Sequence, residues 1–146
     1  TEVGKPTVIN FFVNRALAGE TLTVYEPGTQ ARNFVHVKDV AQAYVRSTER
    51  LVKQLERKET GTETYEIASD EDMSVMEVAE IVQNAAEDVL ETNVDIELIE
   101  NPRGNETVVE RFDVDTSNTQ STINWNTEEF ISDSVYRVLS GNAKNQ

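Results

Sequence analysis

The chain has 146 residues, 38% of them hydrophobic, which suffices for one domain with a buried core but leaves no apolar run long enough for a transmembrane helix. Cysteine is absent and His36 is the single histidine, which excludes disulfide bonds, thiolate metal sites and a zinc site built from histidines. The 27 acidic residues against 13 Lys and Arg give a net charge of −14, which argues against nucleic acid as a partner because such a field repels phosphate backbones. No secretory leader is visible, so we expect a cytoplasmic protein without a membrane partner.

The first quarter of the chain predicts a helix followed by two short strands. Apolar residues recur at helical spacing over residues 7–18 (TVINFFVNRALA), and Gly19 is a natural end for that helix. Residues 22–25 (LTVY) predict a strand. Residues 26–29 (EPGT) predict a turn, since Pro fixes φ and Gly accepts a positive φ. Residues 34–37 (FVHV) predict the second strand.

The middle of the chain predicts a long helix and one more strand. The helix is expected from residue 38 to about residue 55, with its apolar residues on one side. The charged run over residues 56–63 predicts an exposed connection. Residues 64–68 (TYEIA) predict a strand, and the acidic residues 69–72 predict a turn.

The second half of the chain predicts helices alternating with extended segments. Ser74 and Glu77 form a capping box, in which each side chain bonds the backbone N–H of the other residue at the start of a helix. The elements expected after this helix are a strand over residues 94–99, an extended segment over 107–114, a short helix over 116–122, a last helix from 127 to about 139, and a frayed tail over 142–146.

This order of elements predicts an α/β or α+β fold with a small mixed sheet and no complete alternating βαβ series. We expect one domain over residues 1–141. The acidic residues are spread over the whole chain, and lysine is scarce. An evenly acidic, lysine-poor surface suits a protein that works in concentrated salt, where charge repulsion is screened. We therefore expect a halophilic source, with an ordinary acidic surface as the alternative.

The stretch VINFFVNRALAGETLTVYEPGTQARNFVHVKDVAQAYV resembles the second half of the extended short-chain dehydrogenases/reductases, the NAD-dependent epimerase/dehydratase family. Further segments match in family order: ETYEIAS at 63–69, SVMEVA at 74–79, RGNE at 103–106 and DVDTSNTQSTINW at 113–125. The resemblance implies the C-terminal, substrate-binding part of a Rossmann-type enzyme, without the N-terminal cofactor-binding βαβ units.

Two arginines are candidates for binding a diphosphate. Arg32 lies in a predicted loop between short strands, and Arg103 lies in a loop bounded by Pro102 and Gly104. The fork-shaped guanidinium matches phosphate oxygens in bidentate geometry. Spacing alone leaves solvated surface arginines as the alternative. The resemblance implies that both arginines grip the pyrophosphate of a UDP- or dTDP-sugar.

The resemblance implies further substrate-binding residues. Tyr25 and Thr23 match the segment along a uracil or thymine base, which an aromatic face and edge-strand backbone groups would recognise. The alternative for Tyr25 is a core-facing strand residue. Glu106 would bond a ribose hydroxyl or orient the arginine before it, the alternative being a plain surface acid. Gln30 and Phe34 would shape the pocket near the ribose.

Other positions indicate structural roles or depart from the family. His36, alone in a predicted strand, indicates a packed or hydrogen-bonded residue more than a catalyst. The usual Gly-Asp of the turn is replaced by Glu26-Pro27, and the usual Asp after the arginine is Asn33. Glu26 places a negative charge beside a site that should attract phosphate.

The defining chemistry of the family is missing. Neither the glycine-rich G-x-x-G-x-x-G turn, which seats the NAD pyrophosphate, nor a Tyr-x-x-x-Lys pair occurs. We expect no catalytic, cofactor-binding or metal-binding residues in this chain, which should be inactive alone. The resemblance implies NAD(P) in the full-length enzyme, and this chain is expected to be a fragment that lacks the N-terminal Rossmann domain.

Three functions remain open at this point. The chain is the nucleotide-sugar-binding portion of an epimerase or dehydratase, a non-catalytic nucleotide-binding or oligomerisation module of the same fold, or a halophilic interaction domain without a small ligand. The resemblance also implies that the strand over residues 64–68 joins the edge of the cofactor sheet. Because an unpaired strand edge invites pairing, we expect a homo-oligomer formed through this strand.

Overall fold

The computed structural model describes residues 7–102, 104, 109 and 111–143. The chain forms two compact units. Unit 1 contains Thr1–Arg32, Met73–Arg111 and Ile131–Gln146, and unit 2 contains Asn33–Asp72 and Phe112–Phe130. Over the described stretches, no helix combines the length and the apolar character needed to cross a membrane.

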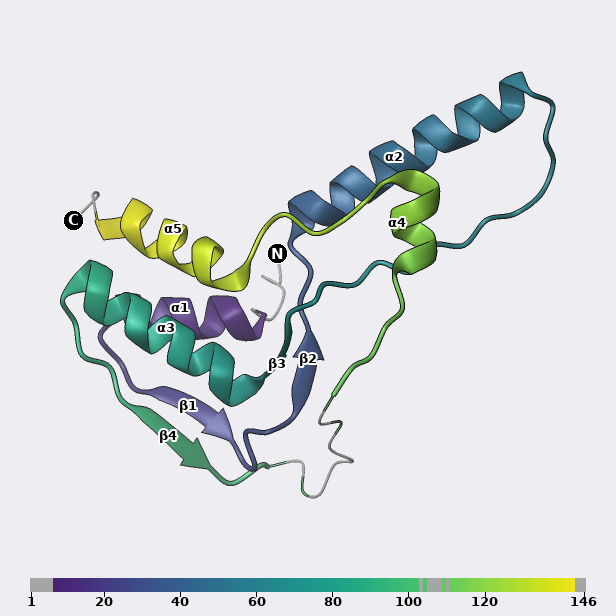
Figure 1. Ribbon diagram of the computed structural model, residues 1–146. Coiled ribbons are helices and arrows are strands. Elements are labelled where there is room, and N and C mark those ends of the chain that lie inside the picture. Colours follow the sequence, from purple (N-terminus) through teal and green to yellow (C-terminus); the bar gives the residue numbers. More distant parts are fainter. Residues whose placement is uncertain (1–6, 103, 105–108, 110, 144–146) are drawn as a thin grey trace, which may run out of the picture. The chain divides into compact units, whose positions relative to one another are not determined.

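Unit 1 is a two-stranded parallel sheet with helices on one face (Figure 1). Strand β1 (Leu22–Tyr25) pairs with β4 (Ile96–Ile99), so that Leu22 lies opposite Ile96 and Tyr25 opposite Ile99. Parallel strands need a crossover connection, and here it includes α3 (Val75–Leu90). The other helices of the unit are α1 (Val8–Leu17) and α5 (Ile131–Ala143).

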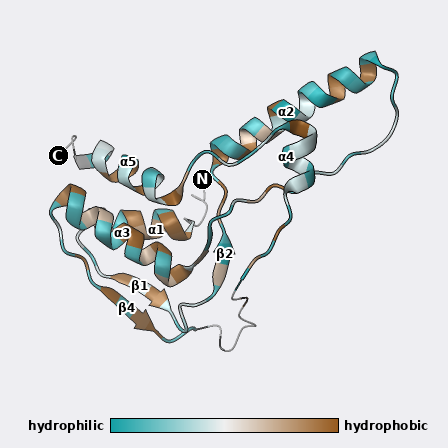
Figure 2. Ribbon diagram, in the orientation of Figure 1, coloured by the Kyte–Doolittle hydropathy of each residue, from teal (hydrophilic) through white to brown (hydrophobic). Residues whose placement is uncertain are grey.

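The interior of unit 1 lies where its helices meet one another and the sheet. Helix α3 contacts α1, α5 and both strands. Its buried residues follow helical spacing and are mostly small, which lets the neighbouring helices approach closely: Val78, Ala79, Val82, Ala85 and Ala86. Strand β1 adds the buried Leu22 and Val24, each worth about 1.5–3 kcal/mol of hydrophobic free energy. Both strands of this sheet are predominantly apolar (Figure 2).

Unit 2 contains α2 (Val37–Glu56) and α4 (Ser117–Ile123), which contact each other. Its apolar cluster consists of Ala43, Ile123 and Trp125, with the partly buried Val35, Tyr65 and Ile67 around it. Trp125 is the single tryptophan of the chain and is 1% exposed. Its indole N–H donates to the backbone oxygen of Asp39 at 2.8 Å, so the largest core residue is also fixed in orientation.

The buried Asp39 fastens the segment after Trp125 to the start of α2. Its carboxylate accepts the backbone N–H of Glu128 at 3.2 Å and that of Glu129 at 3.1 Å. Lys38 adds an ion pair to Glu129 at 3.0 Å. A buried carboxylate is stable in such a place because hydrogen bonds replace its lost hydration.

The short strands β2 (Ala31–Asn33) and β3 (Asp72–Ser74) pair with each other. The chain passes from unit 1 to unit 2 within β2 and returns within β3. Within unit 2, Phe34, which follows β2, donates its N–H to the carbonyl of Glu71, which precedes β3, at 3.4 Å. This bond continues the backbone contact between the two segments for one more residue.

Most of the predicted elements are confirmed. Helix α1 starts after the cap Thr7, and Gly19 follows it with φ +67°. Strand β1 has the predicted bounds, and the long helix α2 and the short helix α4 lie where they were expected. The capping box is present with both of its hydrogen bonds. The expected extended segment over residues 107–114 and the tail over 142–146 lie partly outside the described residues.

The strand predicted over residues 34–37 is wrong, because pairing occurs over residues 31–33 and Val37 already begins α2. Two side chains account for this shift. The amide of Asn33 donates to the Ser69 carbonyl at 2.7 Å and accepts the Ser69 N–H at 3.0 Å, which replaces a backbone ladder. The imidazole Nδ1 of His36 accepts the N–H of Lys38 at 3.1 Å, which caps the helix instead of extending the strand.

The strand predicted over residues 64–68 is also not observed, since these residues have no assigned secondary structure. Their side chains still alternate, with Tyr65 and Ile67 packed inward and Glu66 exposed. The carbonyl of Glu66 accepts the hydroxyl of Thr119 at 2.8 Å, and that of Thr64 accepts the amide of Asn118 at 3.4 Å. Side chains of α4 thus occupy the groups that a neighbouring strand would use.

The last helix begins at Ile131 rather than near residue 127. The residues before it are bound to the Asp39 carboxylate through their backbone N–H groups. This contact with a distant part of the chain holds them outside the helix, and local sequence periodicity contains no signal for it.

Candidate functional site

Among the described residues of unit 1, helices cover one face of the β1–β4 sheet and none covers the other (Figure 1). Leu22 and Val24 point toward the helices and are 0% and 1% exposed. Thr23 and Tyr25 alternate with them and therefore lie on the other face, where Thr23 is half-buried and Tyr25 is 48% exposed. Tyr25 is thus a solvent-accessible aromatic at the carboxyl end of a parallel strand, and the interpretation as a core-facing tyrosine is wrong.

The backbone of β1 leaves one edge unpaired among the described residues. Leu22 donates its N–H to Asp95 at 2.8 Å and Glu26 donates to Ile99 at 2.9 Å, so every second peptide group points toward β4. The peptide groups of Thr23 and Tyr25 consequently point to the opposite edge. In the described part of the chain, β4 is the one strand that pairs with β1. An edge of this kind offers donors and acceptors to a planar ligand.

The turn after β1 is packed tightly. Gly28 is buried with φ +76°, a conformation that favours glycine. A Cβ added there would lie 3.3 Å from side-chain atoms of Val24 and Leu98 and 3.4 Å from the Met76 methyl. The carbonyl of Gly28 accepts the N–H of Met76 at 3.1 Å. The turn therefore has little freedom to move relative to β1 and α3.

The N-termini of α1, α2 and α3 are closed by capping hydrogen bonds. In α3, the first N–H groups bond to the carbonyls of Gly28 and Gln30 and to the Ser74 hydroxyl. The backbone N–H and hydroxyl of Ser74 also lower the pKa of Glu77, whose carboxylate completes the cap. Helices α1 and α2 are capped by Thr7 and His36. The capped ends of these three helices therefore offer few free N–H groups to an anionic ligand.

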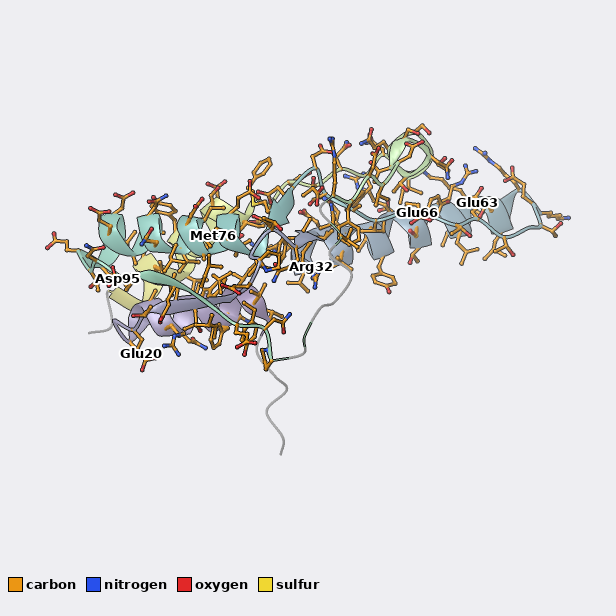
Figure 3. All side chains as sticks on the ribbon, turned by 90° about the horizontal axis from the view of Figure 1, so that it is seen from below. Glu20, Arg32, Glu63, Glu66, Met76 and Asp95 are labelled. Carbon is orange, nitrogen blue, oxygen red and sulfur yellow. The ribbon has the colours of Figure 1, made fainter. Side chains whose placement is uncertain are left out.

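Arg32 is the described cation nearest in sequence to this turn, and it lies on β2 within unit 1 (Figure 3). Its side chain is exposed, and one guanidinium nitrogen donates to the carbonyl of Ala31 at 2.9 Å. Arg103 and Glu106, predicted to act with it, lie outside the described residues, so convergence of the two arginines stays a prediction.

The other predicted site residues have local hydrogen bonds. The Gln30 amide donates to the Tyr25 carbonyl at 3.3 Å. Phe34 belongs to unit 2, is half-buried, and accepts the hydroxyl of Ser69 through its carbonyl. His36 has the hydrogen-bonded structural role that was expected, since it caps α2.

The structure adds two residues that the sequence did not suggest. Glu97 lies opposite Thr23, and Ile99 lies opposite Tyr25, so their side chains share the uncovered face of the sheet. Glu97 is exposed and Ile99 half-buried. Alternation over residues 96–99 indicates that Glu97 and Ile99 lie on the same face of their strand. It does not indicate the register that places them beside Thr23 and Tyr25.

The residues of this chain do not fit a dinucleotide cofactor. The six glycines are scattered and form no glycine-rich turn, and no tyrosine is followed four residues later by lysine. The capped N-terminus of α3 leaves no free amides for a pyrophosphate. In the parts of the chain that the structure describes, no three acidic or histidine side chains gather to hold a metal ion.

Comparisons with known proteins agree with these observations. Residues 4–68 match the NAD dependent epimerase/dehydratase family. The chain is 33% identical over 94 residues to UDP-glucuronic acid decarboxylase 6 of Arabidopsis thaliana, a stretch that covers 64% of this chain and 24% of that protein. It is 38% identical over 99 residues to UDP-sulfoquinovose synthase of Sulfolobus acidocaldarius, covering 66% of this chain and 23% of that one.

The solved structures extend the likeness to the whole fold. A UDP-glucose 4-epimerase of Thermotoga maritima, determined with UDP-glucose, superimposes with a TM-score of 0.73 at 16% identity. The match covers 99% of this chain and 42% of that one, so the chain spans well under half the length of this structure and about a quarter of the curated relatives. The fold class expected from the sequence, part of a Rossmann-type enzyme with a small sheet and helices, is confirmed. Residues 4–68 thus match the NAD dependent epimerase/dehydratase family, and the relatives and the fold of the chain agree with that match.

Proposed function

We propose that this chain binds the nucleotide portion of a nucleotide sugar. The observation that carries the proposal is the uncovered face of the β1–β4 sheet, where Tyr25 is 48% exposed beside an unpaired strand edge. The names of the relatives support the same class of ligand, because they include UDP-glucuronic acid, UDP-sulfoquinovose and UDP-glucose.

In this proposal the base lies against Tyr25, and the N–H and carbonyl of Thr23 and the N–H of Tyr25 read its edge, since the Tyr25 carbonyl already accepts bonds from Gly28 and Gln30. An aromatic ring binds a base face by stacking, which is worth about 1–3 kcal/mol for each base. Backbone donors and acceptors distinguish uracil from a purine by their order along the strand. Ile99, the neighbour of Tyr25 on the same face, adds apolar surface.

The diphosphate would be bound by Arg32 together with Arg103, and Glu106 would accept a ribose hydroxyl. Arg32 is exposed and donates one hydrogen bond to the carbonyl of Ala31, and a guanidinium has five N–H donors, so others remain for phosphate oxygens. The strongly acidic chain makes these arginines necessary, because a net charge of −14 otherwise repels a diphosphate.

The chain would supply substrate binding to an epimerase, dehydratase or related enzyme, whose NAD site and catalytic residues lie in a separate part of the fold. Its small share of the lengths of its relatives and its lack of both cofactor motifs support this role. The chain alone would then bind nucleotide sugars without converting them.

Calorimetric titration with UDP and UDP-glucose tests the proposal. Tyr25→Ala should weaken UDP binding by about tenfold or more, because it removes the stacking surface. Tyr44→Ala is the matched control, since Tyr44 is a 73% exposed tyrosine in unit 2. Absence of UDP binding by the unaltered chain, or equal affinities in the two variants, would contradict the assignment of this face.

A second candidate function, an oligomerisation module, is favoured by the exposed face of α2. Polar residues alternate with apolar ones along this helix (Figure 2). Its exposed large apolar residues are Val37, Tyr44, Val45, Leu51, Val52 and Leu55, and their exposed fractions range from 49% to 73%. Contiguous exposed apolar residues of this kind are typical of a protein–protein interaction surface.

Self-association would place this face, and the backbone of residues 64–68, against a second copy. The peptide groups of Tyr65 and Ile67 support the proposal, because among the described residues they have no hydrogen-bond partner. Sedimentation equilibrium should show a dimer that Leu51→Glu dissociates and Val138→Glu, on α5, preserves. A monomeric wild-type chain at high concentration would exclude this function.

A further inference from the structure

Gln30 connects the end of β1, which its side chain contacts, to the start of α3, which its backbone oxygen contacts. Its Nε2 donates to the carbonyl oxygen of Tyr25 at 3.3 Å. Its backbone oxygen accepts the N–H of Val75, the first residue of α3, at 3.2 Å. One residue thus fixes the last peptide of the strand and the first amide of the helix.

The oxygen and the nitrogen of the Gln30 side-chain amide differ in their hydrogen bonding. Nε2 is engaged with Tyr25, whereas Oε1 is buried and has no hydrogen-bond partner among the described residues. An unpaired buried acceptor destabilises a fold. The reversed amide orientation would be worse still, because it would place Oε1 against the Tyr25 carbonyl, two acceptors in contact. The donated bond to Tyr25 therefore determines how this side chain lies.

The Tyr25 carbonyl accepts two hydrogen bonds in total. Gly28 donates its N–H at 3.0 Å and Gln30 donates from its side chain. Together they orient the peptide plane that follows Tyr25, and β4 holds the N–H of the next residue, Glu26, through Ile99. Since this peptide plane sets the course of the chain at Tyr25, it also sets where the ring stands on the open face.

We propose that Gln30 is a positioning residue for nucleotide binding rather than a residue that contacts the ligand. This inference rests on the proposed function, and it replaces the expectation that Gln30 shapes the ribose pocket directly. One N–H of Nε2 is bound to Tyr25 and Oε1 is buried, so contacts within the protein set the orientation of this amide. Gln30 instead holds Tyr25 and the unpaired edge of β1 in the orientation that receives the base.

Gln83 provides a matched control within the same unit. It is a half-buried glutamine of α3, and its Nε2 donates to the carbonyl of Val94 at 2.7 Å. Gln83→Met and Gln30→Met each remove one amide donor to a carbonyl next to a strand and keep a side chain of similar length. Loss of general stability should be similar in both variants.

The experiment combines UDP titration with amide hydrogen exchange of the ligand-free chain. Gln30→Met should raise the Kd for UDP by about five- to tenfold, the factor that corresponds to one net hydrogen bond. It should also speed exchange at the Gly28 amide, which shares the Tyr25 carbonyl. Gln83→Met should change the Kd by less than about twofold and leave exchange at Gly28 as it was.

The possible results separate the positioning role of Gln30 from the proposed nucleotide-binding function. Equal effects of the two variants on Kd and on Gly28 exchange would overturn the positioning role, as would a Gln30→Met variant that matches the wild type in both. If the wild-type chain does not bind UDP, the proposed function fails. In that case, faster Gly28 exchange confined to Gln30→Met would still support the control of Tyr25 by Gln30, and unchanged exchange would refute it.

Discussion

Substitution of Gly28 by alanine tests whether the turn after β1 is as tightly packed as the coordinates indicate. Gly28 has φ +76°, and an alanine Cβ would lie 3.3 Å from Val24 Cγ1 and Leu98 Cδ2. Gly19 is the matched control, because it has a similar φ of +67° but nothing within 4 Å of an added Cβ. Gly19→Ala therefore measures backbone strain alone, and Gly28→Ala measures strain plus crowding.

The magnitudes follow from these two terms. An L-residue in the left-handed region costs about 1–2 kcal/mol, which applies to both variants. Inserting a methyl group into a packed site costs about 1–3 kcal/mol. We expect the low end, about 1 kcal/mol, because the half-exposed Leu98 can move aside while the buried Val24 cannot. The gain from a stiffer unfolded chain is common to both variants and cancels in their difference.

Thermal unfolding followed by far-UV circular dichroism measures this difference. Gly28→Ala should melt about 3 °C below Gly19→Ala, since 1 kcal/mol corresponds to a few degrees in a chain of this size. It should also weaken UDP binding, because the turn holds the end of β1, whereas Gly19→Ala should not. Equal melting temperatures, or a more stable Gly28→Ala, would refute the tight packing of this turn.

Three further predictions concern unit 2 and the surface. Asp39→Ala should lower the free energy of unfolding by about 2–4 kcal/mol, because it leaves two backbone N–H groups without their charged acceptor. Urea unfolding followed by Trp125 fluorescence measures this loss, and a loss below about 0.5 kcal/mol would contradict the prediction. Hydrogen bonds from Arg50, and then from Tyr65, lower the pKa of Glu63 to about 2. This contact therefore stabilises the fold above the ordinary pKa of 4.5, and its contribution is lost as the pH falls through about 2. NMR titration of the Glu63 carboxyl carbon should show a midpoint near 2, and a midpoint near 4.5 would refute the prediction. The melting temperature should rise from dilute buffer to molar KCl, because salt screens the repulsion within a chain of net charge −14, and a flat or falling trend would count against halophilic adaptation.

Local signals in the sequence predicted the elements whose structure depends on neighbouring residues. The apolar spacing around Phe12, the Ser74–Glu77 capping box and the turn at Gly28 all act within a few residues, and all three are present. The strand predicted over residues 22–25 is also present, and its side chains alternate between buried and more exposed positions.

Long-range partners decided the elements that the sequence did not predict correctly. The amide pair between Asn33 and Ser69 moved the pairing of β2 away from residues 34–37, and these two residues are 36 apart. The bonds from Thr119 to Glu66 and from Glu128 to Asp39 acted in the same way on residues 64–68 and on the start of α5. Such contacts between distant side chains and backbone leave no periodic trace in one sequence.

In the candidate site too, local sequence signals indicate some residues and long-range pairing identifies others. Tyr25 and Thr23 could be placed on a common face from alternation, and the family pattern singled out Arg32 and Gln30. Glu97 became part of the same face only through the parallel register of β1 with β4. The domain prediction, one unit over residues 1–141, stays a prediction beside the two compact units of the structure.

The central claim is that Arg32 and Arg103 bind one diphosphate, and a double-mutant cycle tests it most directly. Kd values for UDP and for uridine are measured by calorimetry with the wild type, Arg32→Gln, Arg103→Gln and the double variant, and Arg57→Gln in α2's exposed end serves as the control. We expect each single variant to weaken UDP binding by about tenfold, with uridine binding unchanged and with less than additive loss in the double variant. Unchanged UDP affinity in either single variant, or equal losses for UDP and uridine, would contradict the claim.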